Sequence, residues 1–141
     1  MPARSANAAC PCGSGRKFKR CCLRLHQGAP AATPEALMRS RWSAYVVGDV
    51  DYIVATTDPE GPLWRSDRDV WAEEIARFSS STRFEKLEIR EVSPVADDRG
   101  EVTFFAKLAR DGEDVSFCER SRFVRRGGRW VYADGDHVED T

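Results

Sequence analysis

The sequence lacks long apolar runs and an excess of charge of either sign. Its 141 residues contain 22 Lys and Arg against 23 Asp and Glu, a net charge of -1, which argues against a chain that binds nucleic acid or membranes through overall charge. No apolar stretch approaches the ~20 residues of a membrane span. No apolar segment follows Met1, so we expect no signal peptide and a cytoplasmic location. With only 10 Gly and 7 Pro and 41% hydrophobic residues, disordered and fibrous classes are excluded as well.

Charged residues are unevenly distributed along the chain, which divides it into a basic and an acidic part. Six basic residues and no acidic one precede Pro30, whereas all 23 acidic residues follow it. The segment from Gln27 to Ala32 is small and aperiodic, which is typical of a linker. We therefore expect a small basic unit over residues 1–28, a linker over 29–32 and a second domain over 33–141.

Periodicity in the second domain changes from helical to alternating near Thr82. Thr33 caps a predicted helix that ends at Gly48, Asp49 begins a short second helix, and a capping box at 66–69 begins a third. Alternating strands follow, with turns at 97–100, 111–112 and 127–128; the strands are predicted over 84–95, 102–108, 115–123 and 130–132. Helices first and an antiparallel meander second indicate an α+β fold, with three helices packed on a curved antiparallel sheet.

Four of the five cysteines lie within thirteen positions, at Cys10, Cys12, Cys21 and Cys22. Two close pairs joined by a short loop match a tetrahedral Zn(II) site, and in a reducing compartment such a cluster favours a metal over disulfides. Unpaired thiols are the alternative, and His26 is an alternative fourth ligand. A segment this short buries no core of its own, so we expect it to depend on the metal while the second domain folds without it.

Two stretches resemble known families. CPCGSGRKFKRCC resembles the SEC-C motif, a zinc module of the preprotein translocase ATPase, although the final position here is Cys22 where the motif also allows His. ALMRSRWSAY at 36–45 and ERSRF at 119–123 resemble the YchJ-like family. That resemblance implies SEC-C motifs joined to a domain similar to nuclear transport factor 2, a cone of helices wrapped by a curved sheet.

The basic loop between the cysteine pairs is the candidate docking surface. It comprises Arg16, Lys17, Phe18, Lys19 and Arg20. SEC-C modules of the translocase ATPase contact the export chaperone or the ribosome, so the resemblance implies a protein or ribosomal partner and an adaptor function. Weak nucleic-acid binding is the alternative, in which Phe18 stacks on a base and the cations contact phosphates.

Polar residues interrupt an apolar strand face at Glu119 and Ser121, between Phe117 and Phe123. A carboxylate on such a face needs a partner, and the first helix offers Arg39 and Arg41. A buried Arg–Glu pair is the structural interpretation. The alternative is a small-ligand pocket at the open end of the cone, with these candidates: Arg39, Trp42, Tyr45, Glu119 and Ser121.

An enzyme that uses Glu119 as a general acid or base is the third hypothesis. The sequence contains no catalytic triad, phosphate-binding loop or cofactor fingerprint, so no catalytic residue is assigned and a non-enzymatic role is favoured. Cys118 alternates to the opposite face from Glu119, as a buried apolar residue would.

Overall fold

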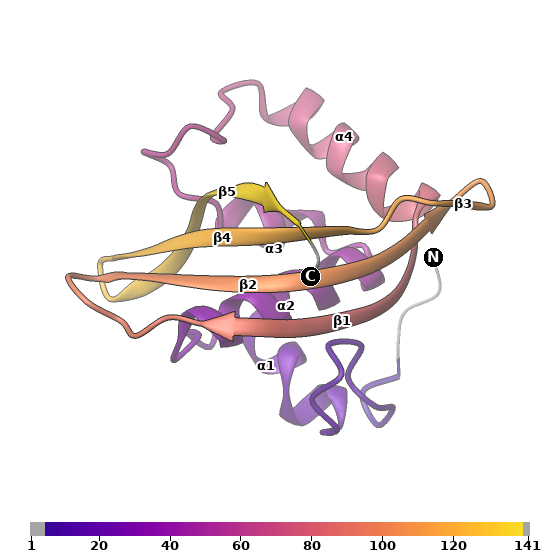
Figure 1. Cartoon of the computed structure of the whole chain (residues 1–141), viewed down its shortest axis with the longest axis horizontal. Coiled ribbons are helices and arrows are strands. Elements are labelled where there is room, and N and C mark those ends of the chain that lie inside the picture. The colour runs from indigo at the N-terminus through magenta and orange to yellow at the C-terminus, as the bar shows by residue number, and fades with distance from the viewer. Residues whose placement is uncertain (1–4, 140–141) are drawn as a thin grey trace.

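The structure, a computed structural model, describes residues 5–139 (Figure 1). Arg4, one of the six basic residues before Pro30, lies outside this range. The helical elements are a 3-10 helix η1 (Phe18–Arg20), α1 (Cys22–His26), α2 (Pro34–Val47), α3 (Val50–Ala55) and α4 (Arg68–Ser81). The strands are β1 (Arg83–Val92), β2 (Arg99–Arg110), β3 (Glu113–Asp114), β4 (Phe117–Arg126) and β5 (Arg129–Val138).

Two of the three predicted helices begin at their predicted caps, Thr33 and Asp49. The third is capped by Asp67, one residue after the Ser66 that begins the predicted capping box. The side chains of Thr33, Asp49 and Asp67 accept hydrogen bonds from the first turns of α2, α3 and α4, which satisfies amide groups that a helix leaves unpaired at its start. Helix α2 ends at Gly48 in a left-handed conformation, φ 80°, which glycine adopts without steric cost.

The strands form one antiparallel sheet in the order β1-β2-β4-β5, and the short β3 pairs with β2. Asp97 and Asp98, with φ of 53° and 57°, make a two-residue turn, so β2 begins at Arg99, inside the predicted turn. The last strand continues to Val138, well beyond the predicted end at 132. Figure 1 shows a strongly curved sheet with α2 and α3 behind it and α4 along one edge. The α+β architecture is therefore confirmed.

Helix α2 lies between the sheet and the cysteine segment. Its buried residues Leu37 and Met38 belong to one apolar cluster with Phe18 and Cys22 on one side and Phe104 of β2 on the other. The division at 28 and 33 stays a prediction about domains, but the packing is continuous across it. No helix within residues 5–139 is long and apolar enough to cross a membrane.

Candidate functional site

Four thiols converge where the N-terminal loop meets the first residue of α1. The Sγ atoms of Cys10, Cys12, Cys21 and Cys22 all lie within 4.8 Å of one another, and all four residues are buried. Cys21 Sγ lies 3.6 Å from Cys12 Sγ and 3.9 Å from Cys22 Sγ. A tetrahedron with metal–sulfur bonds of ~2.3 Å has sulfur–sulfur edges of about 3.8 Å. These residues therefore fit a four-coordinate metal ion.

Two glycines and a few backbone hydrogen bonds set the geometry of the loop that holds the first cysteine pair. Gly13 and Gly15 have φ of 80° and 87°, a region open to glycine. The Cys10 amide donates to Arg16 O at 2.8 Å and the Gly13 amide donates to Cys10 O at 3.2 Å. These bonds fold the chain back so that the first cysteine pair meets the second.

Hydroxyl groups and neighbouring thiols surround the sulfur atoms. Ser14 Oγ lies 3.2 Å from Cys21 Sγ, and Ser43 Oγ of α2 lies 3.5 Å from Cys10 Sγ. Hydrogen bonds with Cys12 and Cys22 lower the pKa of the Cys10 thiol, whereas the hydrogen bond with Cys10 raises the pKa of Cys22. A bound cation would hold all four sulfurs as thiolates.

His26 does not join the cluster. Its Nε2 lies 2.8 Å from the Ser40 carbonyl, so this nitrogen carries a proton and donates, and its ring packs against Phe18 and Tyr52. In this tautomer the free lone pair is on Nδ1, which lies 4.0 Å from Asp49 Oδ2, and neither ring nitrogen belongs to the group of ligand atoms formed by the four sulfurs. The alternative of His26 as the fourth ligand is therefore not supported.

Phe18 corrects part of the predicted docking surface. It is 4% exposed and lies in the core, so it cannot stack on a base or a partner without leaving the apolar cluster. Arg16, Lys17, Lys19 and Arg20 are all exposed, and their role in docking stays a prediction.

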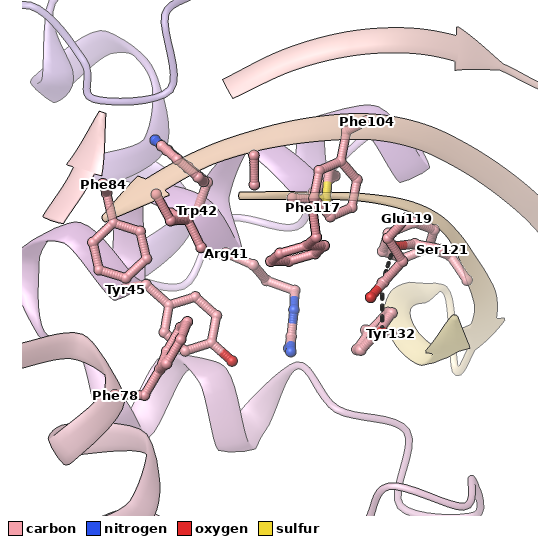
Figure 2. Close-up of a pocket in the computed structure, with 14 residues that line it drawn as sticks. Arg41, Trp42, Tyr45, Phe78, Phe84, Phe104, Phe117, Glu119, Ser121 and Tyr132 are labelled. Carbon is pink, nitrogen blue, oxygen red and sulfur yellow. Dashed lines mark hydrogen bonds between the residues drawn. The ribbon is translucent and has the colours of Figure 1, made fainter. Parts of the chain in front are cut away.

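A second feature is a cavity of about 230 Å³ between α2, α4 and the concave face of the sheet (Figure 2). Its apolar lining consists of Met38, Trp42, Phe78, Phe84, Phe104, Ala106, Leu108, Phe117 and Phe123. Its polar lining consists of Arg41, Tyr45, Glu119, Ser121 and Tyr132. Four of the five predicted pocket residues, Trp42, Tyr45, Glu119 and Ser121, therefore meet here.

Arg39 is the exception, and its predicted place in the pocket is corrected. Its Nε donates to Glu35 at 2.9 Å and its Nη1 donates to the Cys12 carbonyl at 2.8 Å. Positions two apart lie about 200° apart around an α-helix, so Arg41 faces the cavity while Arg39 faces the cysteine loop.

The predicted Arg–Glu pair is also corrected. Glu119 Oε2 accepts from Ser121 Oγ at 2.6 Å and from Tyr132 Oη at 2.8 Å, and no ion pair joins it to an arginine within residues 5–139. Arg41 instead donates from Nη1 to Ile53 O and Thr56 Oγ1, and its guanidinium lies 4.7 Å from the centre of the Tyr132 ring. Burial, and then the charge of Glu119, raise the pKa of Tyr132, so this hydroxyl stays a donor.

Comparison with known protein families identifies two modules in the chain. Residues 33–135 match the family described as "YchJ, middle NTF2-like domain", and residues 7–24 match the SEC-C motif. The chain belongs to the YchJ-like family.

Relatives in this family share most of the chain. A UPF0225 protein of Sodalis glossinidius is 41% identical over 92% of the chain and 83% of its own length, and one of Vibrio vulnificus is 40% identical over 94% and 77%. The solution structure of a SEC-C motif containing protein from Rhodopseudomonas palustris is similar with a TM-score of 0.78 and 39% identity, covering 92% of the chain and 98% of that protein.

Tyr132 is the site residue that the sequence analysis missed. The alternation of β5 places it in a strand but does not say which face it occupies. Its hydroxyl reaches Glu119 because Phe123, on the cavity face of β4, pairs with Tyr132 in the sheet. The only signal in the sequence was an aromatic residue with a polar tip in a strand beside an interrupted apolar face.

Proposed function

We propose that this protein is a zinc-binding adaptor of the cytoplasm, in which a closed site of four cysteines shapes a basic surface that docks on an anionic partner. The observation that carries the proposal is the convergence of four buried sulfurs within 4.8 Å of one another. Four protein ligands leave no open coordination position, which is typical of structural rather than catalytic zinc. Thiolate ligands and tetrahedral spacing favour Zn(II) over the harder cations.

The surface around this site is strongly basic. Arg16, Lys17, Lys19, Arg20 and Arg24 are exposed, and none of them forms an ion pair with a carboxylate within residues 5–139. Their charge balances the formal -2 of a zinc tetrathiolate and leaves a net positive face on a chain that is acidic elsewhere.

Part of this face is hollowed. A cavity of about 190 Å³ beside Cys21 and Cys22 is lined by Arg16, Arg20, Arg24 and Arg39, and no acidic residue contributes to its lining. Guanidinium groups bind carboxylates and phosphates through paired hydrogen bonds. An acidic protein surface or the ribosome is thus a suitable partner, in line with the SEC-C motif.

Charge reversal tests this proposal. We expect Arg16→Glu, Lys17→Glu, Lys19→Glu and Arg20→Glu together to abolish association with ribosomes or with a captured acidic protein, and the wild-type association to weaken with salt. The matched control reverses two arginines and two lysines on exposed positions elsewhere: Arg77, Arg83, Lys86 and Lys107. Binding that survives the first set, or that the control abolishes equally, contradicts docking by the basic loop.

A further inference from the structure

Two oppositely charged side chains line the cavity under the sheet, and neither has a counter-ion within residues 5–139. They are Arg41 of α2 and Glu119 of β4. Burying an ionised side chain costs free energy unless its charge is paired and its hydrogen bonds are made. Arg41 is buried and Glu119 is half-buried, so their unused bonding capacity is a feature that packing alone does not explain.

Arg41 is 7% exposed, and all of its side-chain hydrogen bonds come from one nitrogen atom, Nη1. Nη1 makes hydrogen bonds to Ile53 O at 3.1 Å and to the hydroxyls of Thr56 and Thr57 at 2.7 and 3.4 Å. Nε and Nη2, which carry three N–H donors, donate to no group that the structure describes. Figure 2 shows the guanidinium group in the middle of the cavity-lining residues.

Glu119 is held in the same one-sided way. Both of its hydrogen bonds, from Ser121 and Tyr132, go to Oε2, and Oε1 accepts none from the described chain. Gly135 of β5 makes room for this arrangement, because a Cβ there would overlap Oε2 and lie 2.7 Å from Cδ. The carboxylate is thus fixed at one oxygen and free at the other.

The remaining walls of the cavity limit the shape and size of the ligand that it can hold. Its walls are mainly aromatic, with Tyr45, Phe78 and Phe84 packed edge to face or stacked on one another. At about 230 Å³ it is smaller than the ~300–1,000 Å³ of sites for drug-sized molecules. A ligand with one planar ring and a short polar group fits these limits.

We propose that this cavity binds a small, uncharged, planar molecule of the carboxamide or lactam class, whose carbonyl oxygen accepts from Arg41 and whose N–H donates to Glu119. Charged ligands are disfavoured, because a carboxylate would be repelled by the negative charge of Glu119 and an ammonium group by the positive charge of Arg41. A molecule that offers both an acceptor and a donor uses the free atoms of both side chains. The cavity residues are separate from the basic docking loop, so this inference does not depend on the adaptor proposal.

Three probes of equal size separate the charge classes. The full-length protein with its metal bound is titrated with benzamide, benzoate and benzylamine, and binding is followed by amide chemical shifts in β4 and β5. We expect benzamide to bind about tenfold more tightly than either charged probe, which is the effect of about one lost hydrogen bond to a charged group. Benzoate or benzylamine binding most tightly, shifts confined to the basic loop, or no binding by any probe would overturn the proposal.

Substitution at Glu119 tests the order of probe affinities, which would not change if Glu119 had a purely structural role. Glu119→Gln keeps an acceptor for Ser121 and Tyr132 but replaces the free oxygen by an N–H group. We expect benzamide to bind about tenfold more weakly and benzoate more tightly, which reverses their order. Glu101→Gln, at an exposed position of β2, is the control and should preserve the order. An unchanged order in Glu119→Gln contradicts the inference.

Discussion

The indole Nε1 of Trp42 donates a hydrogen bond to the carbonyl oxygen of Pro11, 3.0 Å away and 31 residues earlier in the chain. Trp42 lines the cavity on α2, and Pro11 lies between the first two cysteines of the metal site. Arg39 adds a second bond, to the Cys12 carbonyl. The cysteine loop is therefore hydrogen-bonded to α2, the helix that packs against the sheet. We expect loss of a metal ion from the four cysteines to disturb the packing of α2 as well.

Removal of the metal should destabilise the whole chain rather than the cysteine loop alone. The charge pattern and the linker predict that the domain from residue 33 folds without metal, whereas in the structure Phe18 and Cys22 share a core with Leu37 and Met38. With free zinc at a thousand times its dissociation constant, binding contributes about 4 kcal/mol, which corresponds to roughly 8–16 °C in the melting temperature. Melting of the chelated protein, followed by circular dichroism and by β2 and β4 amide signals, measures this effect. A sheet that melts at the same temperature with and without metal would show that the two parts are independent.

Each of the four clustered cysteines should be required for metal binding, and the fifth should not. Serine in place of Cys22 removes one of four thiolates, so we expect less than one equivalent of zinc to remain after dialysis against a chelator. Cys118→Ala is the control, because Cys118 is also buried, at 6% exposed against 2% for Cys22, but lies in β4. Full zinc retention in Cys22→Ser, measured by elemental analysis, would exclude the tetrathiolate.

Local signals in the sequence predicted the parts of the structure that local physics decides. The helix caps at Thr33 and Asp49 form within one turn, and the cysteine pairs are close along the chain, so their spacing indicates their geometry. Alternation predicted that Glu119 and Ser121 share one face of the strand, because side chains two positions apart in a β-strand point to the same side of the sheet.

Tertiary packing decided the rest. Whether Arg39 or Arg41 faces the sheet depends on how α2 is rotated, and Phe18 is buried because α1 and α2 close over it. The position of Tyr132 depends on an irregularity in the pairing of β4 with β5, where Phe123 pairs with Tyr132 but Arg122 pairs with Asp134. Such a bulge shifts which residues share a face, and no pattern within β5 reveals it.

Asp58 should make stability depend on pH in the acid range. This carboxyl is 2% exposed and accepts from Arg126 Nε at 2.6 Å and Nη2 at 3.1 Å, and the hydrogen bond from Arg126 holds its pKa below the usual value. Because the folded pKa is lower than the unfolded value of about 3.9, the stabilisation is present above about pH 4 and is lost as the pH falls through the folded pKa.

Replacement of this carboxyl measures the effect directly. Asp58→Asn should cost about 1.5–3 kcal/mol in urea unfolding at pH 7, and the difference from the wild type should shrink toward pH 3. Glu73→Gln, which removes an exposed pair with Arg77, should cost only about 0.3–0.5 kcal/mol. A penalty for Asp58→Asn that is the same at both pH values would mean that its charge does not stabilise the fold.

Gly135 should be needed only while Glu119 is present. Alanine at 135 would place its Cβ against the Glu119 carboxylate, which can move away only by giving up its bonds from Ser121 and Tyr132. We expect Gly135→Ala to lower the free energy of unfolding by about 1.5–3 kcal/mol, whereas Glu119→Gln, which keeps an acceptor at the same place, should change it by less than about 1 kcal/mol. In a Glu119→Ala background the clash is gone, so the same Gly135→Ala change should be nearly neutral, and the double-mutant cycle should show a coupling of similar size to the loss in the wild type. Equal losses in the two backgrounds, measured by urea unfolding, would mean that Gly135 serves the backbone of β5 and not the position of the carboxylate.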